Sequence, residues 1–328
     1  MNILVFGKDG QLGKAFKSIF DQLSSSENLH ITYLGRAECD LSKEVEVLAQ
    51  LNISKADLII NASAYTAVDK AETEIDLAYT VNAKAPELMA RYAAENNATF
   101  LHYSTDYVFD GSKEGFYSEV DVRNPLGMYG KSKAAGEEAI EKAFEQAFVN
   151  SSKGQFAIFR TSWVYGDGGN FIRTMLRLAK DREELKVIHD QHGVPTSADW
   201  LARISLDLAL DAQLQLKQFP SGIYHAVPAG ETTWHGLACF AIRAALNAGV
   251  ELKAKPEAIV PILALEYPLP APRPMNSRMD GSKLRAALQN GVSGASNSYN
   301  EHQNVPNFPA WDGMVREYVI QLASKGLI

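Results

Sequence analysis

The sequence predicts an α/β fold of the Rossmann type, in which a doubly wound parallel sheet has helices on both faces. Three observations support this prediction. Short β-branched runs alternate with amphipathic stretches through the first half of the chain, a glycine-rich loop follows the first run, and a polar cluster follows the fourth. Strands that alternate with helices form βαβ units with right-handed crossovers. The second half is expected to form a smaller, irregular α/β lobe that binds the substrate.

The elements of the first half are expected in regular alternation. Residues 11–22 are expected to form a helix with Phe16 and Ile19 on one face, and residues 76–95 repeat apolar side chains at helical spacing. A further helix is expected to carry Tyr129 and the Ala/Glu-rich run after it. The strands are expected at residues 3–6, 30–34, 58–61, 98–104 and 155–160.

This alternation ends near Gly166. The proline-rich residues 252–280 cannot form a regular helix, and the polar residues 291–309 are expected to form an exposed loop. We therefore divide the chain into a Rossmann domain, 1–165, to which the chain partly returns at about 190–248, and a discontinuous substrate-binding lobe, 166–328. In the second half, helices are expected at residues 170–180, 200–213 and 311–324 and a strand at residues 222–227.

The composition is that of an ordinary globular protein and argues against several classes. The 328 residues are 46% hydrophobic and 22% charged, and the formal net charge of -7 argues against nucleic acid, which needs a clustered basic surface. Cys39 and Cys239 lack metal-ligand spacing and are expected to be reduced. No apolar run approaches the ~20 residues that span a bilayer, and the N-terminus lacks signal-peptide features. We expect a cytoplasmic protein without a membrane segment.

The loop GKDGQLG directly follows the first expected strand and is a candidate ligand site. Its glycines Gly7, Gly10 and Gly13 allow positive φ or a close approach to a ligand. The helix that starts there offers free N–H groups to a pyrophosphate, and Gln11 and Leu12 would contact the same ligand. The spacing differs from G-x-G-x-x-G and is the variant of extended short-chain dehydrogenases/reductases. Its place at the first βα junction favours a dinucleotide cofactor over a plain glycine turn.

The end of the second expected strand bears on the choice of cofactor. A carboxylate there would bind the ribose 2′-OH of NAD, whereas arginine favours the 2′-phosphate of NADP. The sequence has Arg36 at this place and no acid until Glu38, so NADP(H) is expected. NAD(H) is the alternative, because a nearby arginine can also stack on adenine. The remaining contacts are expected from Asp40 and Leu41, which would flank the adenine, and from Ala62, Ser63 and Ala64, which would pass beneath the phosphates and ribose.

A proton-transfer set is expected where the fourth strand meets the helix of Tyr129. Strand ends of an open parallel sheet are ligand sites, so Thr105 and Asp106 should face the cleft. Tyr129 and Lys133 share one helix face, and a nearby ammonium favours the phenolate and lowers the tyrosine pKa. Thr105 can hydrogen-bond the phenol or a substrate oxygen. Each residue alone has an ordinary structural interpretation, but the three in this order after a glycine loop indicate catalysis.

Six motifs together resemble one enzyme family. They are GKDGQLG, NASAYTAVDKAE, STDYVFDG, YGKSKAAGE, RTSWVYG and RPMNSRMD, and they follow the family's order over nearly the whole chain. The chain is similar to the dTDP-4-dehydrorhamnose reductases, a branch of the extended short-chain dehydrogenases/reductases. The resemblance implies reduction of the 4-keto group of dTDP-6-deoxy-L-lyxo-4-hexulose to dTDP-L-rhamnose by NADPH or NADH, the last step of dTDP-rhamnose synthesis.

The resemblance also implies roles for individual residues. Tyr129 would be the proton donor, and Lys133 would bind the nicotinamide ribose and tune the tyrosine. Thr105 would be the hydroxyl partner, and with Asp106 it would contact the sugar. Tyr103 would lie beside the cofactor.

The rest of the substrate site is expected in the second half. Trp163 would cover the sugar by the same resemblance, and Asn170 of GDGGNF could line the pocket. Arg273 and Arg278 lie in an otherwise rigid proline segment, where their forked guanidinium groups suit the pyrophosphate of the substrate. The alternative is that both are surface arginines of a loop.

The sequence departs from the family at one metal site. Some members are described with magnesium at a dimer contact, bound by an acid on the first helix, and the matching residue here is Ala15. Asp190 remains, but a lone acid is a weak site for a hard cation. We therefore predict no metal site, and the sequence leaves both monomer and homodimer open.

Other functions remain open from the sequence. A nucleotide-sugar dehydratase shares the fold and the Tyr/Lys pair but needs an extra acid and base, usually Asp-Glu after the threonine. Here Asp106 is followed by Tyr107, which argues against elimination but not against another nucleotide-sugar reductase or epimerase. A non-catalytic NADP-binding regulatory subunit, like that of methionine adenosyltransferase, would keep the fold and bind another enzyme. Intact Tyr129, Lys133 and Thr105 favour an enzyme.

Overall fold

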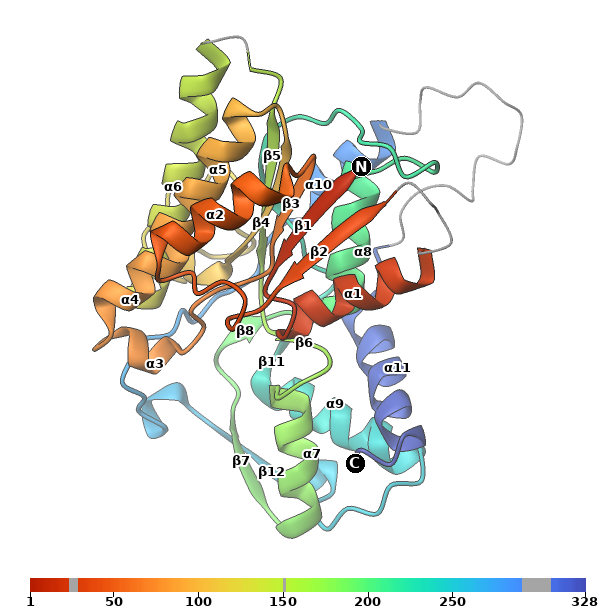
Figure 1. The fold of residues 1–328 in the computed structure, drawn as a ribbon. Coiled ribbons are helices and arrows are strands. Elements are labelled where there is room, and N and C mark those ends of the chain that lie inside the picture. Colours follow the sequence, from red (N-terminus) through yellow and green to blue (C-terminus); the bar gives the residue numbers. More distant parts are fainter. Residues whose placement is uncertain (24–28, 150–151, 291–307) are drawn as a thin grey trace.

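Six parallel strands form the central sheet of the protein, in the spatial order β10-β5-β4-β3-β1-β2 (Figure 1). The structure is a computed structural model and describes residues 1–23, 29–149, 152–290 and 308–328. The last strand at one edge, β10, comes from the second half of the chain and pairs with β5. The strands are β1 (Asn2–Phe6), β2 (His30–Leu34), β3 (Leu58–Asn61), β4 (Thr99–Thr105), β5 (Gln155–Thr161) and β10 (Gly222–His225).

Helices cover both faces of this sheet, because its central strands are apolar on both sides. In β1, Ile3 and Val5 join the hydrophobic cluster beneath α1 and α8, whereas Leu4 and Phe6 join the cluster beneath α2, α5 and α6. This alternation follows from the period of two residues along a strand. The α/β fold that the sequence predicts is therefore confirmed. The covering helices are α1 (Gln11–Leu23), α2 (Glu44–Ser54), α5 (Ala85–Glu95), α6 (Met128–Val149) and α8 (Ala198–Ala209).

The long helix expected over residues 76–95 is interrupted. It comprises α4 (Ile75–Tyr79), a π-helical turn (Thr80–Lys84) and α5. Pro86 explains the interruption, since it has no N–H to donate to the carbonyl of Asn82 and its ring crowds that carbonyl. The freed carbonyl lies against α6 at Gly136, where a Cβ would approach it to 2.1 Å.

The sequence analysis missed four α-helices of the described residues: α2, the short α3 (Val68–Ala71), α9 (Trp234–Asn247) and α10 (Ser282–Asn290). In α2, Val47 and Leu51 are buried, but Val45 and Ile53 are exposed by 79% and 75%. Apolar residues on both sides of a helix weaken the periodic signal on which the prediction depends.

A smaller lobe lies at one end of the sheet, below it in Figure 1. Its core packs three helices around a two-stranded parallel ladder of β7 and β12. Residues 252–280 contain β12 but no α-helix, and most of the expected polar loop, residues 291–307, lies outside the described residues. No helix in the described part of the chain is long and apolar enough to cross a membrane. The elements of the lobe are α7 (Phe171–Asp181), β7 (Leu185–Ile188), α9, β12 (Ile259–Ile262) and α11 (Trp311–Ser324).

Candidate active site

The loop between β1 and α1 forms a backbone cradle that only glycine allows. Gly7 has φ of 92°, and a Cβ there would lie 2.6 Å from Ser63 Oγ. A Cβ on Gly13, in the first turn of α1, would lie 2.0 Å from the carbonyl oxygen of Gly7. The loop therefore packs tightly on the residues that follow β3 and directs the N-terminus of α1, with its free N–H groups, toward the carboxyl edge of the sheet. This arrangement fits a pyrophosphate.

A cavity of about 690 Å³ opens over this cradle. It brings together the end of β4, the start of α6 and the chain after β5 at the carboxyl edge of the sheet, where ligands bind in such folds. The predicted site residues that line it are Gly7, Gly10, Gln11, Leu12, Arg36, Ala62, Ser63, Ala64, Tyr103, Thr105, Asp106, Tyr129, Lys133 and Trp163.

A second cavity of about 410 Å³ adjoins the first, and Gly35, Arg36, Ser63 and Ala64 line both. Its wall includes Asp40 and Leu41, the residues expected to flank the adenine. The two connected cavities suit an extended dinucleotide better than a compact ligand. The donor set of the cradle and the length of the cavities thus fit a nicotinamide dinucleotide.

The charges near Gly35 bear on the choice of cofactor. Arg36 is exposed at the rim shared by the two cavities. The acid nearest in sequence, Glu38, accepts the N–H of Gly35 at 2.8 Å and faces Lys8 at 3.4 Å. The hydrogen bond from Gly35 is the main reason that the pKa of Glu38 is lowered. Glu38 is thus engaged within the protein, whereas Arg36 at the shared rim is placed to meet a ligand phosphate.

Thr105 and Asp106 close the end of β4 and are both buried, with exposures of 6% and 3%. The Thr105 hydroxyl donates to Asp106 Oδ1 at 2.9 Å. Asp106 Oδ2 has no hydrogen-bond partner among the described residues. Burial raises the pKa of Asp106 to about 6, against smaller opposing effects of hydrogen bonds with Ser277 and Thr105. A buried carboxylate oxygen without a partner at a cavity wall is an acceptor for a ligand hydroxyl.

Tyr129 lies in the first turn of α6 and lines the cavity. Its ring packs edge-on against Tyr107, with 5.6 Å between centroids. Burial raises the pKa of Tyr129 to about 12, the charge of Asp106 acts in the same direction, and a hydrogen bond with Thr105 opposes both. The sequence analysis expected Lys133 to lower this pKa. In this ligand-free state burial outweighs any such effect, so Tyr129 keeps its proton at neutral pH.

Lys133, one turn along α6, is 1% exposed. Its Nζ donates to the carbonyl of Tyr103 and lies 3.2 Å from His102 Nε2. Burial lowers the pKa of Lys133 to about 8, and the nearby carboxylate of Glu137 opposes this shift. Lys133 is thus held by β4, at the wall of the cavity that it shares with Tyr129.

Residues 1–294 match the family model of the RmlD substrate binding domain. The chain belongs to this family. The curated dTDP-4-dehydrorhamnose reductase of Escherichia coli (strain K12) is 42% identical over 289 residues, which cover 87% of this chain and 91% of that relative. The resemblance that the motifs predicted is thus confirmed, and with it the prediction of an NAD(P)H-dependent oxidoreductase.

Solved structures of relatives agree with this family assignment. A dTDP-4-dehydrorhamnose reductase from Clostridium acetobutylicum is 32% identical, with a TM-score of 0.79 over 98% of this chain and 99% of that chain. The dTDP-4-dehydrorhamnose reductase of Bacillus anthracis, solved in complex with NADP, is 28% identical, with a TM-score of 0.78 over 97% and 98% of the two chains. The prediction of NADP(H) as a cofactor agrees with this complex.

Trp163, expected to cover the sugar in this family, has an unusual backbone. Its φ of 49° is in the left-handed region, which costs free energy for a residue other than glycine. The ring stacks on Trp234 with 3.8 Å between centroids, and a Cβ on Gly193 would approach it to 2.7 Å. Packing from the lobe thus fixes the indole at the cavity wall.

The other residues expected to bind the substrate lie outside the cavity wall and have partners within the protein. Asn170 caps α7 by accepting the N–H of Arg173, and its amide donates to Tyr318 at 2.9 Å. Arg273 pairs with Asp69 at 2.7 Å, and Arg278 with Glu231 at 3.0 Å. Of the remaining sequence-predicted residues, all but Gly13 line one of the two cavities.

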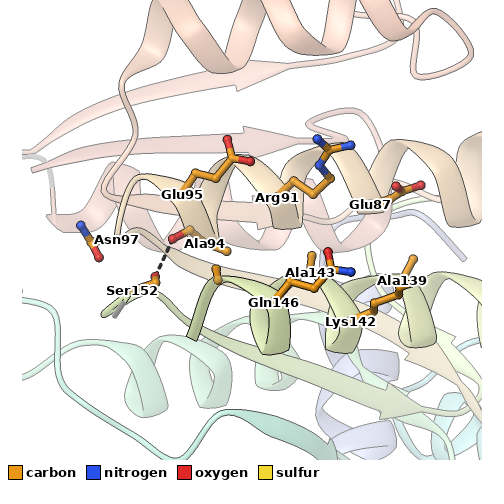
Figure 2. Close-up of a pocket in the computed structure, with 11 residues that line it drawn as sticks. Glu87, Arg91, Ala94, Glu95, Asn97, Ala139, Lys142, Ala143, Gln146 and Ser152 are labelled. Carbon is orange, nitrogen blue, oxygen red and sulfur yellow. Dashed lines mark hydrogen bonds between the residues drawn. The ribbon is translucent and has the colours of Figure 1, made fainter. Parts of the chain in front are cut away.

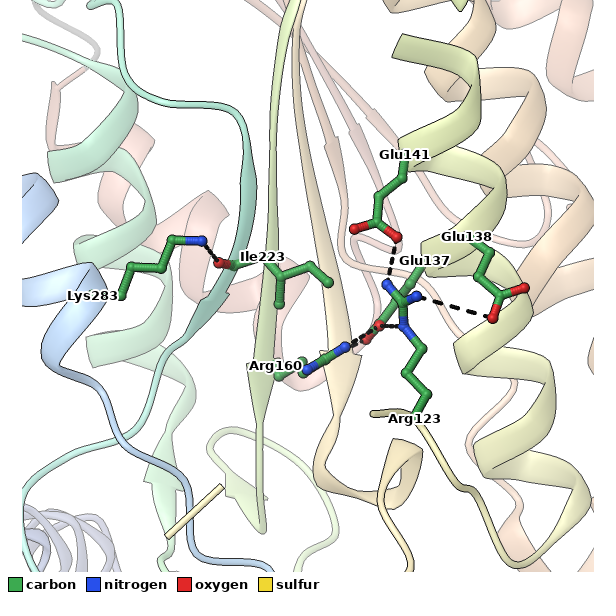
Figure 3. Close-up of polar contacts among 7 residues, drawn as sticks. All are labelled: Arg123, Glu137, Glu138, Glu141, Arg160, Ile223 and Lys283. Carbon is green, nitrogen blue, oxygen red and sulfur yellow. Dashed lines mark hydrogen bonds and ion pairs between the residues drawn. The ribbon is translucent and has the colours of Figure 1, made fainter. Parts of the chain in front are cut away.

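The sequence analysis missed a buried ion-pair network behind the catalytic helix (Figure 3). Glu137, fully buried on α6, is bound by Arg160 of β5 at 2.6 Å and by Arg123 at 2.6 Å. It also missed Ser277, whose side chain acts to lower the pKa of Asp106, although RPMNSRMD contains this serine. No sequence signal joins Arg160 to Glu137, because their contact depends on the packing of α6 against the sheet.

A further hollow of the described surface is not the site. It measures about 830 Å³ and lies between α5 and α6, with Glu87, Arg91 and Lys142 among its lining residues (Figure 2). None of the predicted site residues lines it. Ala15 lies in the core beneath α1, and the described residues contain no group of three acidic, histidine or cysteine side chains able to bind a metal.

Proposed function

We propose that this protein reduces the 4-keto group of dTDP-6-deoxy-L-lyxo-4-hexulose to dTDP-L-rhamnose, with NADPH as the reductant. The observation that carries the proposal is that one cavity contains the glycine cradle, Thr105, Tyr129 and Lys133. The names of the relatives, dTDP-4-dehydrorhamnose reductases, supply the identity of the substrate.

The cofactor would be held by the chain segments that line both cavities. The cradle of Gly7 to Gly13 would hold the pyrophosphate, Arg36 would meet the 2′-phosphate, and Asp40 and Leu41 would flank the adenine. When bound, the cofactor supplies the hydride that reduces the ketone carbon.

Tyr129 would donate the proton to the developing alkoxide. Its pKa of about 12 ensures that the phenol is protonated at neutral pH. Thr105 can donate to the substrate oxygen or to the phenol, and the positive charge of Lys133 stabilises the phenolate left after transfer. The proposed reduction therefore needs no acid or base besides Thr105, Tyr129 and Lys133.

Recognition of the sugar would fall to Asp106 and Trp163. Asp106 Oδ2 can accept from a sugar hydroxyl, and the fixed indole of Trp163 can cover the ring. Arg273 and Arg278 remain the proposed partners of the pyrophosphate, and each would have to exchange a carboxylate for it. The sugar dehydratase alternative is weakened further, since desolvation raises the pKa of the partly buried Tyr107, which is therefore no acidic partner at neutral pH.

Both cysteines are free, which suits the cytoplasmic location that we propose with this function. The oligomeric state, monomer or homodimer, stays a prediction that sedimentation would decide.

The test is oxidation of NADPH, followed at its nicotinamide absorbance, with the dTDP-linked 4-keto sugar. The parent protein should turn over, and Tyr129→Phe should lower kcat by on the order of 10²–10⁴-fold while still binding NADPH. Tyr92→Phe, on α5 and outside both cavities, is the matched control and should keep its activity. Binding of NADPH without turnover by the parent would instead support a regulatory subunit.

A further inference from the structure

A chain of buried hydrogen bonds connects Lys133 to the backbone of Ser63. The N–H of Ser63 donates to Asn61 Oδ1 at 3.2 Å, and Asn61 Nδ2 lies 3.1 Å from His102 Nδ1. His102 Nε2 lies 3.2 Å from Lys133 Nζ. Asn61 and His102 are both 0% exposed and face each other in the β3–β4 register.

The donor and acceptor roles in these hydrogen bonds are fixed at the Ser63 end. The N–H of Ser63 can only donate, so Asn61 Oδ1 accepts and its amide nitrogen must donate to His102 Nδ1. A neutral imidazole that accepts at Nδ1 carries its proton on Nε2. The Nε2–H then points at Lys133 Nζ.

An ammonium cannot accept this hydrogen bond, because it has three donors and no lone pair. An uncharged amine can accept it and still donate to the carbonyl of Tyr103. We propose that Asn61 and His102 act as positioning residues which, through the fixed donor of Ser63, favour the uncharged amine of Lys133 in the ligand-free protein. This inference goes beyond the proposed reductase function, and only its kinetic consequence rests on that function.

The charges around Lys133 do not remove this preference for the uncharged amine. On α6, Glu137 favours the ammonium, but it is already neutralised by Arg160 of β5 and by Arg123. Tyr129, on the same helix, holds its proton. The groups of β4 and of the residue after it that face the site are the neutral ring of His102, whose pKa burial lowers strongly, the protonated phenol of Tyr103, and Asp106.

Protonation of Lys133 therefore needs a rearrangement. The proton of His102 must move to Nδ1 so that Nε2 can accept, and the Asn61 amide must turn to accept in its place. Ser63 then loses its acceptor. Because Ser63 lines both cavities, the far end of the chain lies where a ligand oxygen can take over its N–H.

The first test is the tautomer of His102 in the ligand-free protein, read from its ring ¹⁵N shifts by NMR above the pKa of Lys133. The sequence has seven histidines, and loss of one signal in His102→Gln assigns it. We expect the proton on Nε2. A proton on Nδ1 would overturn the proposal without reference to activity.

The second test reverses the donor–acceptor direction of the hydrogen bonds between Asn61 and Lys133. In Asn61→Asp both carboxylate oxygens accept, so His102 should carry its proton on Nδ1 and offer Nε2 to the ammonium. The pKa of Lys133, followed by ¹³Cε NMR, should rise by on the order of one to two units. Asn82→Asp is the matched control: Asn82 is equally buried and accepts the N–H of Tyr65 at 2.8 Å, but it contacts Ser132 instead of His102.

The outcomes separate the two proposals. If the Lys133 pKa rises as much in Asn82→Asp as in Asn61→Asp, or rises in neither variant, the chain of hydrogen bonds has no role and the proposal fails. If the protein is a reductase, the alkaline limb of its pH–rate profile should move upward with the pKa in Asn61→Asp. An inactive protein in which the NMR shifts still follow this pattern would contradict the reductase function but support the inference.

Discussion

The Asp106 carboxylate gives a prediction in which stability and activity change in opposite directions. Asp106 is 3% exposed, and one of its oxygens has no partner among the described residues. Replacing it by asparagine keeps an oxygen that can accept from Thr105 and removes the buried charge. We expect Asp106→Asn to stabilise the ligand-free protein and to impair its reaction.

The size of the expected stability gain follows from the pKa of Asp106. Burial raises the pKa of Asp106 from 3.8 to about 6, a shift of about two units, which corresponds to on the order of 3 kcal/mol of destabilisation when the group is ionised. Because the folded-state pKa is raised, this cost is fully present above about pH 6. It declines as the pH falls through the folded value and is absent below the unfolded value. The amide has its own burial cost, so a gain of about 1–3 kcal/mol is expected at pH 8.

Urea unfolding at several pH values measures this difference. The stability gain of Asp106→Asn should be largest at pH 8 and should vanish below about pH 4. Asp110→Asn is the control with the opposite sign, since hydrogen bonds from Ser112 lower the pKa of Asp110 to about 2. Its ionised form contributes stability that is present above the unfolded pKa and lost as the pH falls through about 2. A variant at Asp106 that is less stable than the parent at pH 8, or a gain independent of pH, would refute the reasoning.

The same substitution should lower kcat/KM, because an amide replaces the acceptor proposed for a sugar hydroxyl. A loss of about 10- to 100-fold corresponds to one hydrogen bond with a charged partner. Unchanged kcat/KM would remove Asp106 from the substrate site.

Two further predictions test the cofactor rim and the buried network. Arg36→Ala should lower the ratio of kcat/KM for NADPH over NADH by on the order of tenfold, since a charge-assisted contact with the 2′-phosphate is lost, and an unchanged ratio would contradict the role of Arg36. Arg160→Met should lower the free energy of unfolding by on the order of 3 kcal/mol, because Glu137 keeps only Arg123 as a cationic partner, and urea unfolding within about 0.5 kcal/mol of the parent would contradict this.

Much of the fold could be predicted because its signals are local. Strands β2 and β3 have the predicted bounds, β1 and β5 differ from theirs by one residue at one end, and β4 is shifted by one residue. The break in the helix before α5 could not be placed, although Pro86 is visible in the sequence. Its position depends on where the freed carbonyl of Asn82 finds room against α6, which is at Gly136.

The candidate site likewise has residues that the sequence could predict and contacts that it could not. Tyr129, Lys133 and Thr105 were found because their spacing follows from one helix and one strand end, and the structure brings them to one cavity. The partners of Arg273 and Arg278 could not be found, since Asp69 lies 204 residues away from Arg273 along the chain.

The sequence by itself determined the family, the order of most elements and the residue types of the catalytic set, because motifs and periodicity are written along the chain. Only the tertiary structure decided which protons those residues hold. The pKa of Tyr129, Lys133 and Asp106 depends on burial, and the direction of hydrogen bonds at Lys133 depends on the register of β3 and β4. Both arise from segments far apart in the sequence, whose contact exists only in the folded protein.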